Sequence, residues 1–204
     1  MTLRRGVILD RDGTLIDMVR DEDNGAFTPA FHPSQLRFLS GVLDGLTALR
    51  DAGFTFCLAT NQPGPAKGQY SARAVEQTNQ ALEAELLARG IRLEAVEVCL
   101  HHPRGGPGGN PLLVGACSCR KPLPGMLLAA MAKAGLDPNL TWMVGDSRAD
   151  LEAGRAAGLK VGLVYTTDRC EACPLRGGPP GAPDVVGPSF DVVARAIVAD
   201  AARS

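Results

Sequence analysis

Short apolar segments alternate along this chain with longer segments of helical periodicity, and no other feature constrains the fold as strongly. The apolar segments are predicted strands, and they lie at residues 6–9, 54–59, 95–100, 141–145 and 161–165, with a short edge strand at 184–186. Predicted helices occupy residues 40–52, 71–90, 124–134 and 148–157, and a last helix follows Ser189. Ser40, Ser71 and Ser189 are the expected N-caps of the first, second and last of them. Parallel strands need such crossover helices, because each strand must start at the same edge of the sheet as its neighbour. The sequence therefore predicts an α/β fold, a three-layer, Rossmann-like parallel sheet with helices on both faces.

The composition is typical of one domain with a substantial core. Of the 204 residues, 45% are apolar and 21% are charged. We find no repeat and no domain linker in the sequence, so residues 1–204 are expected to form a single domain. Two Gly- and Pro-rich stretches, within residues 99–119 and 166–183, are then loop insertions in that domain.

Charge and hydropathy argue against two classes of partner. The formal net charge is −1 and the pI is near 6.3, with no run of basic residues, which disfavours nucleic-acid binding. No apolar run approaches the roughly 18 residues that a membrane-spanning helix needs. Arg4 and Arg5 precede only a short apolar run, too short for an export signal. We therefore expect a cytoplasmic monomer, in a compartment where thiols stay reduced.

Polar residues with distinct chemistry follow the predicted strands. Since ligands bind at the carboxyl ends of parallel strands, these residues are expected to converge on one crevice. They are Asp10, Arg11 and Asp12, then Thr60, Asn61 and Gln62, then Asp146 and Asp150, with Arg120 and Lys121 beyond the third strand. Two aspartates two positions apart at a strand end face the same way and repel each other unless a cation lies between them. Carboxylates combined with substrate phosphate and water suit Mg²⁺.

Each of these aspartates also has a purely structural interpretation. Asp-Gly pairs such as Asp12-Gly13 are common in turns, and Asp146 and Asp150 would be favourable at the start of a helix. Asp150 fits a helix-capping or outer role better than a metal-binding one. For any single aspartate the structural interpretation remains open. For the set as a whole it is disfavoured, because unrelated turns would not all fall at strand ends.

The set resembles the haloacid dehalogenase superfamily of phosphotransferases. The shared motifs are DRDGT at residues 10–14, the strand-end Thr60, then Lys121, and GDxxxD at residues 145–150, in that order. The resemblance implies catalysis through an aspartyl-phosphate with the help of Mg²⁺. No insertion large enough for a cap domain follows Asp17 or the second predicted strand. The resemblance therefore implies an essentially capless enzyme with an open site.

The resemblance also implies a role for each matching residue. Asp10 is the expected nucleophile, and Asp12 is the general acid for the leaving alcohol and then the base that activates water. Thr60 and Lys121 are expected to hold the non-transferring phosphoryl oxygens. Mg²⁺ is expected to bind to Asp10, to Asp146 and, through its carbonyl oxygen, to Asp12.

A second group of reactive side chains lies in VCLHHPRGGPGGNPLLVGACSCRKPLPG, residues 98–125, which holds three of the six cysteines. Cys99-x-His101 and Cys117-x-Cys119 supply four soft or borderline ligands at the two ends of a Gly- and Pro-rich loop. Four such ligands are typical of a closed, structural zinc site. A disulfide between Cys117 and Cys119 would be strained and out of place in a reducing compartment. A cysteine nucleophile is disfavoured, because the aspartate site already supplies a nucleophile.

Within the superfamily, the pattern CxHHP…CxCRKPxPG resembles the branch of D-glycero-D-manno-heptose 1,7-bisphosphate phosphatases and histidinol-phosphate phosphatase domains. In that branch the matching residues bind zinc, so the resemblance gives this role to Cys99, His101, Cys117 and Cys119. His102 has no matching role and is expected to cap or pack within the loop. Zinc at this place would fix the loop and direct the following Arg-Lys pair toward the substrate phosphate.

The same branch suggests substrate-binding residues. The TNQ sequence that ends in Asn61 and Gln62 matches it, as does Arg120, whose guanidinium suits a second substrate phosphate. Arg11 is expected either to orient the substrate or to be an exposed linker residue.

Three segments fall outside the pattern of that branch. Pro63 and Pro65 replace residues of the pattern, so the contacts of that loop are expected to differ. Residues 20–35 look irregular and form either a substrate-facing flap or plain surface. Cys170 and Cys173 are a redox pair, part of a second metal site or two idle thiols. Idle thiols or a weak metal contact are favoured, because two ligands alone make a poor site.

These observations lead to one functional hypothesis and two alternatives. The resemblance implies a Mg²⁺-dependent, zinc-stabilised phosphatase for a small phosphorylated sugar, converting D-glycero-D-manno-heptose 1,7-bisphosphate to the 1-phosphate. Histidinol phosphate is the alternative substrate, although an amino alcohol would favour an acidic residue where Arg120 stands. A non-catalytic, zinc-stabilised binding module is the alternative from another class. The aromatic content of 4% and the lack of basic runs disfavour that module.

Protein purified without added metal is expected to contain about one zinc ion per chain, because four soft ligands form a closed site. Cys117→Ser should lose the zinc, melt at a lower temperature and bind substrate more weakly. Cys57, which we expect to be a small core residue of a strand, supplies the control, since Cys57→Ser should keep the zinc. Elemental analysis decides the matter, and full zinc retention by Cys117→Ser contradicts the assignment.

Overall fold

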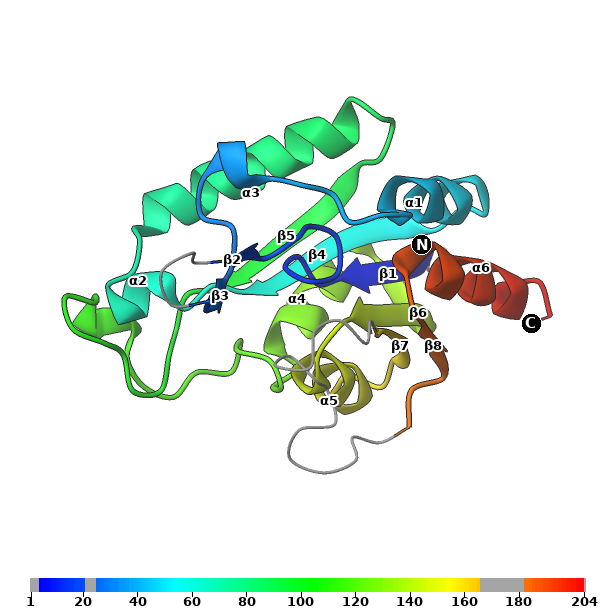
Figure 1. Cartoon of the computed structure of the whole chain (residues 1–204). Helices are drawn as coiled ribbons and strands as arrows, with labels where there is room; N and C mark the ends of the chain where they lie inside the picture. The colour runs from blue at the N-terminus through cyan, green and yellow to red at the C-terminus, as the bar shows by residue number, and fades with distance from the viewer. Residues whose placement is uncertain (1–3, 21–24, 166–181, 204) are drawn as a thin grey trace.

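The computed structural model describes residues 4–20, 25–165 and 182–203. Its main sheet has the strand order β5-β4-β1-β6-β7-β8, and every pairing in it is parallel (Figure 1). The strands are β1 (Arg4–Leu9), β4 (Thr55–Asn61), β5 (Leu93–Cys99), β6 (Leu136–Gly145), β7 (Lys160–Val164) and β8 (Val185–Gly187). The parallel sheet and the edge strand at its far end are confirmed. Because β4, β1 and β6 are neighbours, their carboxyl ends lie side by side.

Helices cover both faces of this sheet. On one face lie α1 (Val42–Asp51), α3 (Ala72–Leu87) and α6 (Phe190–Ala201), and on the other lie α4 (Gly125–Ala134) and α5 (Arg148–Ala156) (Figure 1). The buried side chains accordingly form two clusters, one on each face. In β1, Val7 and Leu9 belong to the first cluster and Ile8 to the second, since successive residues of a strand point to opposite faces. The predicted three-layer fold is confirmed.

All five predicted helices form, with ends that differ by a few residues. Ser71 caps α3 as predicted, since its side-chain oxygen accepts a hydrogen bond from Ala74 N at 3.1 Å. The predicted cap Ser40 is wrong, because α1 follows Gly41 instead, whose φ of 78° favours glycine. Ser189 precedes α6 as predicted, but its hydroxyl contacts the Asp191 carboxylate and makes no cap hydrogen bond.

Several short elements were not predicted from the sequence. They are an antiparallel hairpin of β2 (Val19–Arg20) and β3 (Phe27–Thr28), the single-turn helix α2 (Gly64–Lys67), and two 3₁₀ turns, η1 (Pro33–Gln35) and η2 (Pro111–Leu113). Each is shorter than the window over which an apolar period can be recognised, so hydropathy gives no signal for them. The described parts of the segment 20–35 are therefore more ordered than the sequence suggested.

Candidate active site

A buried lysine lies at the centre of the candidate active site. Lys121 precedes α4, and its Nζ lies 2.6 Å from Asp10 Oδ1 and 2.5 Å from Asp150 Oδ1. The same ammonium donates a hydrogen bond to Ala59 O at 2.7 Å, and only 2% of the side chain is exposed. Burial alone would lower the pKa of Lys121, but the charges of Asp10 and Asp150 outweigh it and raise that pKa. The lysine is therefore a fixed cation beside the predicted nucleophile.

Three carboxylates meet around this cation. Asp10 follows β1, Asp146 follows β6 and Asp150 lies in the first turn of α5, and one oxygen of each lies within 4.8 Å of the others. Burial, together with the charges of Asp150 and Asp12 and against that of Lys121, raises the pKa of Asp10 to about 7. Burial and the charges of Asp10 and Asp150 raise the pKa of Asp146 well above its ordinary value. One lysine does not balance three carboxylates, so the site favours a further cation.

The donor set fits magnesium. Asp10 and Asp146 offer carboxylate oxygens from two neighbouring strand ends, and no sulfur or imidazole group belongs to this cluster. Mg²⁺ prefers oxygen ligands, with one or two carboxylates supplemented by water and phosphate. The placement of Asp10 and Asp146 agrees with the magnesium site expected from the sequence.

Asp150 has two partners that fix its place. Its Oδ2 accepts hydrogen bonds from Ser147 N at 3.1 Å and from Ser147 Oγ at 2.5 Å, which forms the capping box of α5. The capping role expected for Asp150 is thus confirmed. Its ion pair with Lys121 was missed, because the two residues are far apart in the sequence and meet only through packing of the loop against α5.

The structure corrects the expectation for Arg11. This residue is fully buried, so it is no exposed linker, and it does not line the pocket that holds Asp10 and Lys121. Its guanidinium binds the Asp12 carboxylate instead, with Nε donating to Oδ2 at 3.0 Å. The prediction that Arg11 binds the substrate is therefore wrong, because protein atoms enclose its side chain on all sides.

Gln62 is likewise turned away from the pocket and fully buried. Its Nε2 donates to Asp12 Oδ2 at 2.6 Å and to Thr60 Oγ1 at 2.8 Å, while its Oε1 accepts from the Tyr70 hydroxyl at 3.3 Å. Tyr70 is stacked on Phe31 with ring centroids 5.0 Å apart. Gln62 therefore links the predicted general acid to the predicted phosphate-binding threonine, and does not face the substrate.

Asn61 and Arg120 both tie the zinc loop to the site. Asn61 Nδ2 donates to Lys121 O at 3.0 Å, and Lys121 N donates to Asn61 Oδ1 at 3.1 Å. Arg120 Nη1 donates to His101 O at 3.3 Å. Asn61 lines the pocket, so substrate contact is open to it, whereas Arg120 lies outside the pocket lining.

These residues surround one open pocket of about 280 Å³. Its lining residues are Asp10, Asp12, Met18, Pro29, Thr60, Asn61, Lys121, Asp146, Ser147 and Asp150. Met18 and Pro29 flank the hairpin β2–β3, which places this hairpin beside the opening. The catalytic residues expected from four separate motifs are therefore brought together in one place.

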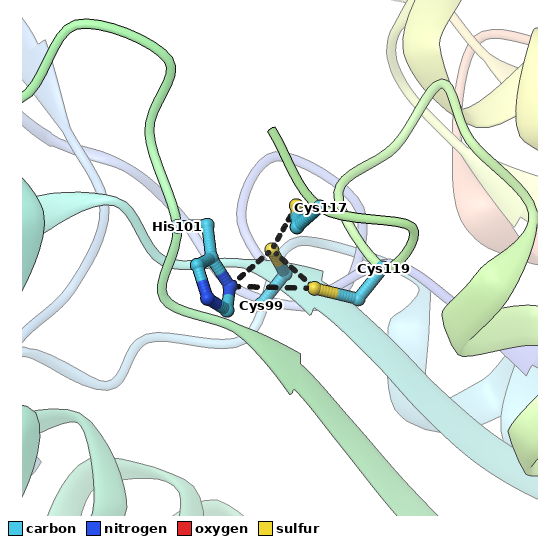
Figure 2. Close-up of side chains that lie close together, drawn as sticks. All are labelled: Cys99, His101, Cys117 and Cys119. Carbon is cyan, nitrogen blue, oxygen red and sulfur yellow. Dashed lines mark hydrogen bonds between the residues drawn. The ribbon is translucent and has the colours of Figure 1, made fainter. Parts of the chain in front are cut away.

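The four predicted zinc ligands point toward one another (Figure 2). Cys99 Sγ lies 3.8 Å from Cys117 Sγ, 2.9 Å from Cys119 Sγ and 3.8 Å from His101 Nδ1, and Cys119 Sγ lies 3.5 Å from His101 Nδ1. Ligands at Zn–S distances of about 2.3 Å in a tetrahedron are separated by roughly 3.8 Å, which matches these distances apart from the shorter one between Cys99 and Cys119. All three cysteines are free thiols. The cluster therefore fits zinc, and the disulfide alternative is wrong.

The loop between the two ligand pairs also packs by its backbone. Asn110 N donates to Pro65 O at 2.9 Å, and a Cβ on Gly109 would come within 2.0 Å of Ala66 O in α2. His102 Nδ1 accepts hydrogen bonds from Arg104 N and Gly105 N, at 3.3 and 3.1 Å, which confirms its capping role. Zinc is thus one of two supports for the loop, because glycines allow it to lie directly on α2. Cys170 and Cys173 lie outside the described residues.

Comparison with known proteins first defines the class. The HAD-hydrolase-like family model matches residues 118–192, which include Lys121 and the GDxxxD motif. A solved structure of D,D-heptose 1,7-bisphosphate phosphatase from B. bronchiseptica, complexed with magnesium and phosphate, has a TM-score of 0.73 to this chain. It is 28% identical in sequence, over 96% of this chain and 99% of that chain.

Two curated relatives narrow the class to a family. The D-glycero-beta-D-manno-heptose-1,7-bisphosphate 7-phosphatase of Pasteurella multocida is 34% identical over 167 residues, 82% of this chain and 84% of that protein. The protein of the same name from Haemophilus influenzae is 33% identical over 187 residues, 90% of this chain and 91% of that protein. The chain therefore belongs to the haloacid dehalogenase-like hydrolases and, within them, to the family of these heptose bisphosphate phosphatases.

Asp146→Asn should separate folding from magnesium binding. The raised pKa of Asp146 means that its ionisation destabilises the folded state, so at alkaline pH the metal-free variant should melt at a higher temperature than wild type. Magnesium at a hundredfold excess over its Kd should stabilise wild type by about 2.7 kcal/mol. Asp146→Asn should lose most of this gain.

Thermal unfolding with EDTA and with Mg²⁺ measures both effects. The exposed Asp44→Asn is the matched control, and it should keep the full stabilisation by Mg²⁺. Equal stabilisation of Asp146→Asn and wild type by Mg²⁺ would rule out Asp146 as a ligand.

Proposed function

We propose that this chain hydrolyses D-glycero-β-D-manno-heptose 1,7-bisphosphate to the 1-phosphate, as the names of its relatives state for those proteins. The observation that carries the proposal is the contact between Lys121 and Asp10 at 2.6 Å. Lys121 follows Cys119, a member of the zinc cluster, by two residues. This contact joins the phosphatase motifs to the motif of the heptose branch. A non-catalytic binding module would have no need of a buried lysine between two carboxylates.

The first step is transfer of the phosphoryl group to Asp10. A carboxylate oxygen of Asp10 attacks phosphorus, and the bond from phosphorus to the sugar oxygen breaks with its electron pair on that oxygen. Asp12 supplies the proton that turns this oxygen into a hydroxyl. Lys121 and Thr60, which both line the pocket, hold the non-transferring phosphoryl oxygens.

The second step releases phosphate. Asp12, now a carboxylate, takes a proton from water as the water oxygen attacks phosphorus, and the bond to Asp10 breaks. Inorganic phosphate leaves, and both aspartates return to their starting states. Mg²⁺, bound by Asp10, Asp146 and the Asp12 carbonyl, would supply charge neutralisation at the phosphoryl group.

A patch of positive charge beside the zinc loop suits the second phosphate of the substrate. Burial and the charges of Lys67, Arg120 and Arg104 together lower the pKa of His102, so three cations act on one imidazole of the loop. Lys67 lies in α2, Arg104 lies in the zinc loop, and Arg120 directly precedes Lys121. A bisphosphate could place one phosphate over Asp10 and the other at this patch, whereas histidinol phosphate offers a cation there.

We further infer the setting in which the enzyme works. Within the described part of the chain, no helix combines the length and apolar character needed to cross a membrane. A cytoplasmic, monomeric enzyme of one domain, without nucleic-acid partners, fits the net charge of −1 and the free thiols of the zinc cluster. Turnover of the heptose bisphosphate, other sugar bisphosphates and histidinol phosphate tests the substrate directly. A preference for histidinol phosphate would overturn the proposal.

Asp10→Asn should lower the turnover number at least about a thousandfold, because the amide cannot form the acyl-phosphate bond. Its fold should persist, since the amide keeps the shape of the side chain. Asp12→Asn should slow hydrolysis of sugar phosphates about a hundredfold or more, as expected for loss of a general acid. Steady-state release of phosphate measures both. Near-normal activity of Asp10→Asn would mean that water attacks phosphorus directly.

Arg120→Ala should raise the KM for the sugar bisphosphate far more than that for 4-nitrophenyl phosphate. A hydrogen bond to a charged group contributes about 2 kcal/mol, roughly thirtyfold in KM. Arg92→Ala, just before the amino end of β5 and so at the opposite edge of the sheet, should change neither constant. Equal losses for both substrates would show that Arg120 only holds the loop through His101 O.

A further inference from the structure

The carboxylate of Asp12 is held by a buried arginine that the two chemical steps do not use. Arg11 has no exposed surface, and its Nε and Nη2 donate to Asp12 Oδ2 and Oδ1 at 3.0 and 3.2 Å. A two-pronged contact of this kind fixes the plane of the carboxylate as well as its distance. Since Arg11 does not line the pocket, it can act on the reaction only through Asp12.

Two acceptors hold Arg11 in turn. Its Nη2 donates to Ala30 O at 2.6 Å and its Nη1 to Asn79 Oδ1 at 2.6 Å. A guanidinium has only donors, so the atom of Asn79 that faces it must be the side-chain oxygen. Asn79 is 4% exposed, and both contacts are buried. Buried hydrogen bonds to a charged group are costly to lose, because no water replaces the missing partner.

The place of Asn79 in the fold makes it a rigid support. It lies in the middle of α3, whose Val75, Leu82 and Leu86 are buried and anchor the helix on the sheet. Its other side faces a hollow of about 650 Å³ between α3 and β5, away from the pocket with the reacting groups. Asn79 is therefore remote from the substrate, and a side chain of similar size can replace it without overpacking the core.

The orientation of Asp12 matters for both steps of the reaction. Its oxygen must meet the leaving sugar oxygen in the first step and the attacking water in the second. A well-placed general acid or base contributes about 10²–10⁴-fold to a rate, and a carboxylate free to rotate loses part of that factor. Arg11 contacts both oxygens of Asp12, with Gln62 and the backbone N–H of Ala30 as further donors, and Asn79 is the side chain that holds Arg11.

We propose that Asn79 is a positioning residue for proton transfer by Asp12, acting through the guanidinium of Arg11. The proposal rests on the phosphatase function proposed above. Asn79, although it lies in α3 on the far side of Arg11, should then affect the rate of the chemical step. The effect should be larger for a leaving group that must be protonated as it leaves.

Three variants at Asn79 and one control test the proposal. Asn79→Leu keeps the size of the side chain and removes the acceptor. In Asn79→Ser the shorter side chain cannot reach Nη1 of Arg11, so this variant replaces the leucine variant if that one does not fold. Asn79→Asp keeps an acceptor for the guanidinium and should retain activity. Gln80→Leu makes the same kind of change at the next, exposed position of α3, whose amide contacts only Glu76 among the side chains that the structure describes.

The measurement compares kcat/KM for two substrates that differ in their leaving groups. One is the sugar phosphate that wild type hydrolyses best, whose alkoxide must be protonated as it leaves. The other is 4-nitrophenyl phosphate, whose phenolate leaves without a proton. Because kcat/KM reports the reaction only up to loss of the leaving group, it isolates the acid step.

We expect Asn79→Leu and Asn79→Ser to lower kcat/KM about thirtyfold for the sugar phosphate and less than about threefold for the aryl phosphate. Asn79→Asp and Gln80→Leu should stay close to wild type with both. Equal losses with the two substrates, or no loss, would overturn the positioning role, because a merely structural role lowers both alike. If wild type hydrolysed neither the sugar phosphate nor the aryl phosphate, the proposed function itself would be overturned, and this inference with it.

Discussion

The active site depends on one buried cation. Lys121 has almost no exposed surface, and its ammonium is surrounded by Asp10, Asp150 and the carbonyl oxygen of Ala59. An uncompensated charge at this depth would be strongly unfavourable, so the lysine and its acceptors can be buried only together. The acceptors come from the ends of β1 and β4 and from the start of α5. The contacts of this one ammonium thereby fix two strands of the sheet, the helix α5 and the zinc loop relative to one another.

The residues just after the zinc loop place that cation at the carboxyl ends of the strands. Cys119 is two residues before Lys121, and the paired hydrogen bonds of Asn61 hold the backbone of Lys121 against the end of β4. The ligand cluster and the contacts of Gly109 with α2 restrain the loop on either side. Zinc bound by this cluster would restrain the loop that carries Lys121 and so would help to place its charge in the site. Removing it should disturb the phosphate-binding end of the site first.

A second set of buried contacts controls Asp12. Arg11 donates to both oxygens of the carboxylate and Gln62 donates to Oδ2. Asn79 accepts a hydrogen bond from Arg11, and Tyr70 donates one to Gln62. A layer of buried polar groups, completed by the half-buried Tyr70, thus sets the orientation of a residue that lines the pocket. Such groups are stabilising only when every partner is present, which makes their geometry well defined.

The sequence alone predicted the parallel sheet, the meeting of Asp10, Asp12 and Asp146 with Lys121, and the cluster of three cysteines and His101. Strands buried on both faces read as apolar runs, and residues just after such runs must meet at the carboxyl edge, so local patterns were sufficient. Tertiary structure alone decided that Arg11 and Gln62 are buried supports for Asp12, that Asp150 pairs with Lys121, and that Asn79 faces Arg11. In the sequence a buried polar side chain looks the same as an exposed one. Its partner comes from another element, and only the packing of the layers brings the two together.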